Sequence, residues 1–227
     1  MAVPIWQQSV EQLGGQASVL ARQRRDHIEL DRLMLLYEWP GLPVPTRQRA
    51  LRELFQLTFS HAFAEETVLW PALRRLAADG EELTSQVEAE HQQINDLAVE
   101  IQSTDPQDPR HDELVATAFV LIRQDIRDEE DVLLPRLQEA LERDPARLRR
   151  LGSAWETVRR TAPTRPHPAV SRRPPDNALA GLPLSAFDRL RDLSAPLSSH
   201  GRWTAAALIA AALAVGLTAI AARRHRR

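Results

Sequence analysis

Two segments of this chain repeat one another 64 residues apart. Residues 61–71 and residues 125–135 each have a Glu–Glu pair at their fifth and sixth positions and a proline at their eleventh. The same offset carries His27 onto His91. A repeat of this length, which shares a polar set inside apolar surroundings, is typical of two similar helical hairpins that face one another.

The composition favours an all-α domain followed by a different kind of segment. Glycine supplies only 8 of the 227 residues, and apolar residues recur at three- and four-residue spacing as far as about residue 160. This spacing places them on one face of a helix. Residues 1–159 carry 18 arginines and 28 acidic residues, whereas residues 160–227 carry 11 arginines and 3 acidic residues. The opposite net charges indicate two parts with different surroundings.

Five helices are expected in the first part. Proline- and glycine-containing stretches at residues 39–45, 79–80 and 103–109 separate the first four. Pro71 should kink or terminate the second helix, and Pro135 should kink the fourth late in its course, because proline lacks an N–H and clashes with the preceding turn. Asp144 and Pro145 read as the cap and first position of a shorter fifth helix. The expected helices cover about residues 16–38, 46–79, 85–102, 112–142 and 144–160.

Eight polar residues fall on the inward faces of the four longer helices. A single inward histidine is most often a hydrogen-bonded core residue, but eight polar groups at matched offsets are harder to explain in this way. Metal ions would neutralise the carboxylates and satisfy the imidazoles together, and helix bundles hold such sites between facing helices. Imidazole and carboxylate without thiolate suit iron, manganese or zinc. The eight residues are His27, Asp31, His61, Glu65, His91, Asn95, Asp125 and Glu129.

These residues resemble the hemerythrin-like domain, also called the HHE cation-binding domain, over about residues 16–160. The matching pattern is His27, His61 with Glu65, Glu66 and Pro71, the pair Glu90–His91, and Glu129 with Glu130 and Pro135. The resemblance implies an up-down-up-down four-helix bundle that holds a non-haem di-iron centre. It also implies that one iron takes His27 and His61, that the other takes its ligands from the third and fourth helices, and that Glu65 and Glu129 bridge the two.

The second half of the pattern departs from the family. The family's fourth-helix histidine is Asp125 here, and Asn95 stands where the family's oxygen carriers have a further histidine. Asp125 is still a competent oxygen ligand, so the expected metal ligands are His27, His61, Glu65, His91, Asp125 and Glu129. Two irons per chain are expected, and one iron is the alternative. Asp31 is expected at the first iron, either as a ligand or as a partner of His27.

Several other polar residues are given no place at the metal. The carboxylates of Glu66, Glu90 and Glu130 neighbour the expected ligands but lie off the main stripe, so they are expected to be mostly solvated. His111 is placed in a loop, and His167, His200 and His225 are placed in the linker or tail, without a metal role.

The remainder of the chain predicts a membrane anchor. Residues 161–202 form a Pro/Arg-rich linker, residues 203–222 are an uncharged run, and residues 223–227 are a basic tail. At about 1.5 Å per residue the uncharged run spans roughly 30 Å, the thickness of the hydrocarbon core. The terminal arginines favour a cytoplasmic C-terminus, but the absence of a signal sequence favours a cytoplasmic bundle, which we predict. Ala212 and Gly216 could pack two anchors into a homodimer.

Three functions are compatible with this pattern. The first is a membrane-tethered iron-binding domain that binds or senses O2, NO or iron itself. The second is a di-iron oxidase or peroxidase, and the third is a degenerate, metal-free membrane adaptor. Nucleic-acid binding is not expected, because the arginines gather in the linker and tail without a folded basic face.

Overall fold

The computed structural model describes residues 3–162, and within them every regular element is a helix. The predicted linker, anchor and tail at residues 163–227 lie outside the described residues. Among residues 3–162, no helix has both the length and the apolar character needed to cross a membrane.

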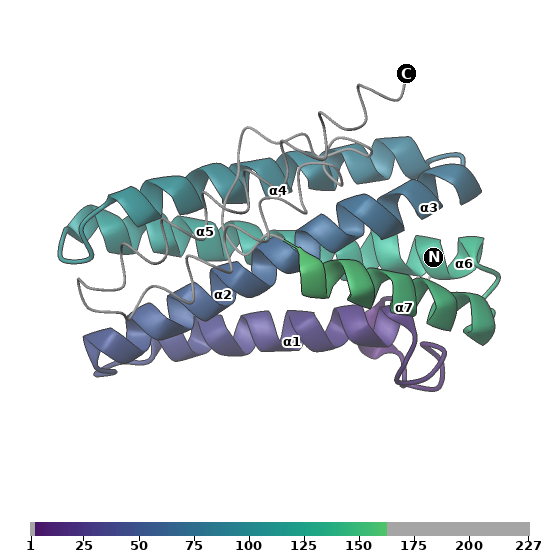
Figure 1. The fold of residues 1–227 in the computed structure, drawn as a ribbon, viewed down its shortest axis with the longest axis horizontal. Helices are drawn as coiled ribbons and strands as arrows, with labels where there is room; N and C mark the ends of the chain where they lie inside the picture. The colour runs from purple at the N-terminus through teal and green to yellow at the C-terminus, as the bar shows by residue number, and fades with distance from the viewer. Residues whose placement is uncertain (1–2, 163–227) are drawn as a thin grey trace, which may run out of the picture.

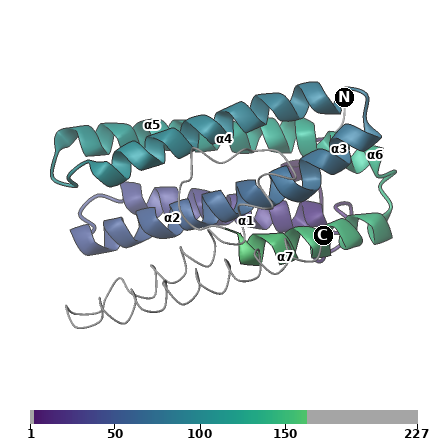
Figure 2. The ribbon, with the colours of Figure 1, turned by 45° about the horizontal axis from the view of Figure 1, so that its top comes forward.

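Four long helical rods form the bundle (Figure 1). The first is α1 (Val19–Glu38). The second is continuous through α2 (Val44–Ala64), η2 (Glu65–Leu69) and α3 (Trp70–Leu76). The third is α4 (Gly80–Ser103), and the fourth runs through α5 (Pro109–Asp128), η3 (Glu129–Leu133) and α6 (Leu134–Ala140). α1 packs beside α2 and α4 beside α5, as the two predicted hairpins require (Figures 1 and 2).

Two short elements complete the described chain. A 3-10 turn, η1 (Ile5–Gln7), contacts α1 and η3, and α7 (Pro145–Thr161) lies along α1 and α2 at one end of the bundle (Figure 1). The backbone N–H of Ala146 donates to the side chain of Asp144, and Pro145 is the first helical residue, so the predicted start of the fifth helix is confirmed. α4 begins five residues earlier than the predicted Ser85, directly after Asp79.

At the two places where kinks are predicted, the structure has π-helical turns. η2 and η3 precede Pro71 and Pro135, and in each the N–H that follows the segment donates to the carbonyl five residues back. The wider turn suits a proline two residues into the next helix, because the proline cannot donate to the carbonyl four residues back. The two π turns lie 64 residues apart, so the sequence repeat is also a repeat of backbone conformation.

The apolar core is split into two clusters. One lies at the α7 end and contains Leu20, Trp70, Leu134 and Trp155, all fully buried. The other lies towards the α1–α2 loop and is built around Leu33, Leu54, Ile94 and Phe119. Along the rods, His27, His61, His91, Asp125 and Glu129 fall between the two clusters, and Glu65 borders the first cluster, so these six residues form a polar layer across the middle of the bundle.

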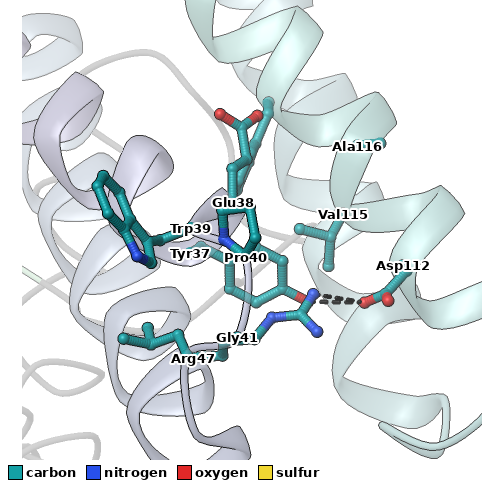
Figure 3. Close-up of a pocket in the computed structure, with 11 residues that line it drawn as sticks. Tyr37, Glu38, Trp39, Pro40, Gly41, Arg47, Asp112, Val115 and Ala116 are labelled. Atoms are coloured by element: carbon teal, nitrogen blue, oxygen red, sulfur yellow. Dashed lines mark hydrogen bonds and ion pairs between the residues drawn. The ribbon is translucent and has the colours of Figure 1, made fainter.

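The α1–α2 loop end has a surface pocket of about 360 Å³ (Figure 3). The Tyr37 hydroxyl donates to Asp112 Oδ1 at 2.9 Å, and Arg47 donates to the same oxygen at 3.1 Å. The Arg47 guanidinium also lies 4.4 Å from the centre of the Tyr37 ring. These contacts tie the start of α2 to α1 and α5, at the opposite end of the bundle from α7.

Candidate metal centre

The six predicted metal ligands meet in the polar layer, and all of them are buried. α1 supplies His27, α2 supplies His61, α4 supplies His91 and α5 supplies Asp125. The two glutamates, Glu65 and Glu129, are the first residues of the two π turns. Their ligand atoms fall into two groups that share Glu129, and within each group the atoms lie within 4.8 Å of one another.

The first group consists of His27, His61, Glu65 and Glu129. Nε2 of His27 lies 3.2 Å from Nε2 of His61. His61 Nε2 lies 3.0 Å from Glu65 Oε1, and His27 Nε2 lies 3.1 Å from Glu129 Oε2. Two imidazole nitrogens and two carboxylate oxygens therefore converge on one point.

The second group consists of His91, Asp125 and Glu129, with Glu65 beside it. His91 Nε2 lies 3.4 Å from Asp125 Oδ1, 3.7 Å from Glu65 Oε2 and 3.8 Å from Glu129 Oε1. Each glutamate thus presents one oxygen to the first group and its other oxygen to the second. This arrangement is the one that a carboxylate bridging two ions needs.

The donor set is suited to cations rather than to internal hydrogen bonding. Among the described residues, no oxygen of Glu65 or Glu129 has a hydrogen-bond partner of normal geometry, and the same holds for Asp125 Oδ1 and His91 Nε2. Buried polar atoms without partners are costly, and buried carboxylates are costlier still. Bound cations would satisfy all of these atoms at once. Imidazole and carboxylate without thiolate suit iron, manganese or zinc.

The outer nitrogen of each of the three histidines faces a carboxylate. His27 Nδ1 lies 2.8 Å from Glu130 Oε1, and His91 Nδ1 lies 2.9 Å from Glu66 Oε1. Glu130 belongs to the second hairpin and Glu66 to the first, so each hairpin orients a histidine of the other. The two contacts are related by the 64-residue repeat. Such a carboxylate keeps the proton on Nδ1 and leaves Nε2 free to bind a metal.

The third histidine is held differently. His61 Nδ1 lies 3.4 Å from Oδ2 of Asp26, which precedes His27 on α1. The repeat places Glu90 where Asp26 stands, and Asp125 where His61 stands. Burial, and then the charges of Asp125 and Asp128, raise the pKa of Glu90 above its usual value. The second group is accordingly richer in carboxylate than the first.

Three expectations about neighbouring residues are wrong. Asp31 does not join the centre: its side chain is 55% exposed and faces Arg123. Glu66 and Glu130 are buried rather than solvated. His111 is buried in the first turn of α5 rather than placed in a loop. Helical spacing does not single out Asp26, whose signal in the sequence is its position directly before a candidate ligand.

The contacts within the cluster shift the pKa values of its members in different directions. Although burial opposes it, contact with Glu129 and Glu130 raises the pKa of His27 to about 9. Burial and the charge of Glu129 raise the pKa of Glu65 to about 7. Burial raises the pKa of Glu129 as well, but the closeness of the His27, His61 and His91 imidazoles outweighs burial and holds the pKa of Glu129 well below its usual value.

Comparison with known proteins agrees with this geometry. The hemerythrin HHE cation-binding domain family matches residues 18–137, which contain all six candidate ligands. An uncharacterized hemerythrin-like protein of Schizosaccharomyces pombe is 28% identical over 138 residues, which are 59% of this chain and 65% of that protein. The chain therefore spans less than two thirds of that relative. No solved structure matches the chain significantly. The family match covers more than half of the sequence, and the chain belongs to the hemerythrin HHE cation-binding domain family.

Proposed function

We propose that this chain holds two iron ions in the polar layer, one in each group of ligand atoms, and that the centre binds or senses O2, NO or iron. The observation that carries the proposal is the placement of Glu65 and Glu129. Both are buried, their four oxygens lack hydrogen bonds among the described residues, and each glutamate offers one oxygen to each group.

The residues divide into those that would hold the ions and those that hold the ligands in place. His27 and His61 would bind the first ion, His91 and Asp125 the second, and Glu65 and Glu129 would bridge them. Asp26, Glu66 and Glu130 keep the three imidazoles turned inward. When bound, iron supplies one-electron redox chemistry and coordination of small ligands. The apolar clusters flank this layer along the bundle.

The carboxylate-rich second group supports a second candidate, a di-iron oxidase or peroxidase. Asp125 stands where an imidazole would be, and Glu90 lies beside it. Anionic oxygen ligands stabilise the ferric state more than imidazole does, which favours oxidation over reversible binding of O2. Steady turnover of peroxide by the iron-loaded chain would favour the enzyme. Ligand binding without turnover would favour the sensor.

The first test is the iron content of the full-length chain, loaded anaerobically with Fe²⁺ and desalted. About two irons per chain are expected, falling to about one in His91→Ala and to none in Glu129→Leu, because Glu129 belongs to both groups. Asp31→Asn is the matched control, since Asp31 is an exposed carboxylate one turn from His27. Absence of iron from the unmodified chain, or equal loss in the control, would contradict the proposal.

Attachment to a membrane remains a separate proposal, supported by the uncharged run at residues 203–222. The full-length chain should sediment with membranes after alkaline carbonate washing, and a chain ending at residue 202 should not. Release of both by the wash would contradict an anchor. Protease protection of the bundle in sealed inverted vesicles would contradict the predicted cytoplasmic side.

A further inference from the structure

The last turns of α7 reach the metal centre from outside the four-helix bundle. The Trp155 ring is fully buried and meets the His61 ring edge-on, with ring centres 5.5 Å apart. One turn later, Nη1 of Arg159 lies 3.4 Å from Oδ2 of Asp26, and its guanidinium lies 5.3 Å from the Trp155 ring centre. α7 therefore contacts both His61 and the carboxylate that holds it.

A single oxygen connects Arg159 to the candidate ligand. Asp26 Oδ2 lies 3.4 Å from His61 Nδ1 and 3.4 Å from Arg159 Nη1. Asp26 is only 6% exposed, so its charge needs a cationic partner. When His61 is neutral and bound to a metal through Nε2, Arg159 is the cation in contact with Asp26. Arg159 is also close to Glu156, at 3.4 Å, so it belongs to a small charged network on α7.

The close approach of α7 to α1 is built into the sequence. At Gly152, an added Cβ would lie 2.7 Å from the carbonyl oxygen of Ala17 and 2.8 Å from the backbone nitrogen of Val19. Glycine therefore allows α7 to touch the backbone at the start of α1, which also carries Asp26. α7 lies beyond residues 18–137, the part of the chain that matches the family.

We propose that Arg159 is a positioning residue of the metal centre: through Asp26 it fixes the orientation of His61, so α7 is a working part of the centre. This inference rests on the proposed metal-binding function, because it treats His61 as a ligand. It assigns a role to a residue outside the six ligands and outside the family match.

The test compares Arg159→Leu with Arg160→Leu in the full-length chain. Arg160 is the next residue of the same helix, its side chain is 74% exposed, and it pairs with Glu156 rather than with Asp26. Fe²⁺ affinity is measured anaerobically, together with the melting temperature of the metal-free chain. Arg159→Leu is expected to weaken Fe²⁺ binding about tenfold, the lower end of the range for partners of metal-bound histidines, while Arg160→Leu leaves it unchanged.

A second measurement reports on the imidazole itself. In the Zn²⁺-loaded chain, the Nδ1–H resonance of His61 should move upfield and exchange faster in Arg159→Leu, but not in Arg160→Leu. Arg159→Lys, which keeps the charge, should restore part of the affinity and of the resonance position. A residue that only supports the fold would lower the melting temperature without moving this signal.

A double-mutant cycle decides whether Arg159 acts through Asp26. Asp26→Leu should weaken Fe²⁺ binding at least as much as Arg159→Leu does, and the double variant should bind no more weakly than Asp26→Leu alone. Additive losses, or losses no larger than that of Arg160→Leu, would overturn the inference while leaving the metal site intact. If the unmodified chain binds no metal, the proposed function fails and this inference fails with it.

Discussion

At the scale of single residues, helical spacing together with the family resemblance singled out the six candidate ligands, but not the carboxylates that hold their imidazoles. Asp31 lies one turn from His27 and was expected to assist it, yet it faces Arg123 at the surface. Glu130, which comes from the opposite hairpin, holds His27 instead. Spacing along one helix cannot reveal a contact between helices, because that contact depends on how far and at what rotation the two helices pack.

A titration of Tyr37 tests the packing at the other end of the bundle, because the chain contains a single tyrosine. Burial and the hydrogen bond to Asp112 raise the pKa of Tyr37 to about 12, above about 10 for a free phenol. The neutral phenol is therefore favoured in the folded chain. Its contribution to stability is complete below about pH 10 and is lost as the pH rises towards 12.

Absorbance at the phenolate wavelength should thus titrate with a midpoint near 12 in the folded chain. Asp112→Asn should lower that midpoint, because the neutral amide removes the negative charge beside the hydroxyl. Glu142→Gln, at the opposite end of the bundle, is the control. A midpoint near 10 in a chain that remains helical would show that the Tyr37 hydroxyl is neither buried nor hydrogen-bonded to Asp112.

At the scale of elements, the two π turns determine what the Glu–Glu pairs can do. The first glutamate of each pair faces the ligand atoms, and the second faces an imidazole Nδ1 from the other hairpin. The expectation that Glu66 and Glu130 are solvated assumed a regular α-helical period. A π turn changes that period locally, which is why such turns are frequent at functional sites.

Gly152→Ala tests the close packing of α7 against the start of α1. The added methyl group would press on the backbone of Ala17 and Val19, which cannot move without displacing the start of α1. Overpacking of this kind costs about 1–3 kcal/mol, so the melting temperature of the metal-free chain should fall. Iron affinity should fall as well, because α7 carries Trp155 and Arg159 to the centre.

Ser153→Ala is the matched control for this substitution, since the Ser153 side chain is exposed and bonds only to Arg149 of its own helix among the described residues. It should leave both the melting temperature and the iron affinity near those of the unmodified chain. If Gly152→Ala and Ser153→Ala had equal melting temperatures and equal iron affinities, the close packing of α7 would matter to neither property.

At the scale of the whole molecule, the polar layer divides the core into two apolar clusters. A core interrupted by buried carboxylates gains less from apolar burial than a continuous one, and unpaired buried carboxylates oppose folding. Cations that bind only the folded state would reverse this cost. The metal centre is therefore expected to stabilise the bundle as well as to carry its function.

Metal removal should measure that stabilisation. With free Fe²⁺ at about 100 times the dissociation constant of one site, occupation of that site stabilises the folded state by about 2.7 kcal/mol. For a domain of this size the gain corresponds to a rise in melting temperature of about 5–10 °C. Differential scanning calorimetry under anaerobic conditions, with and without a chelator, should show it, and Glu129→Leu should abolish it. An unchanged melting temperature for the unmodified chain would favour the metal-free adaptor.

The sequence by itself determined the bundle and its candidate centre. The apolar period and the inward histidines and carboxylates are properties of single helices, and the offset of 64 residues can be read directly from the chain. Only the tertiary structure decided the contacts around these ligands. Glu66 and Glu130 each contact a histidine of the other hairpin, and Asp26 contacts both His61 and Arg159 of α7. These contacts join residues distant in sequence, so they depend on packing that no periodicity encodes.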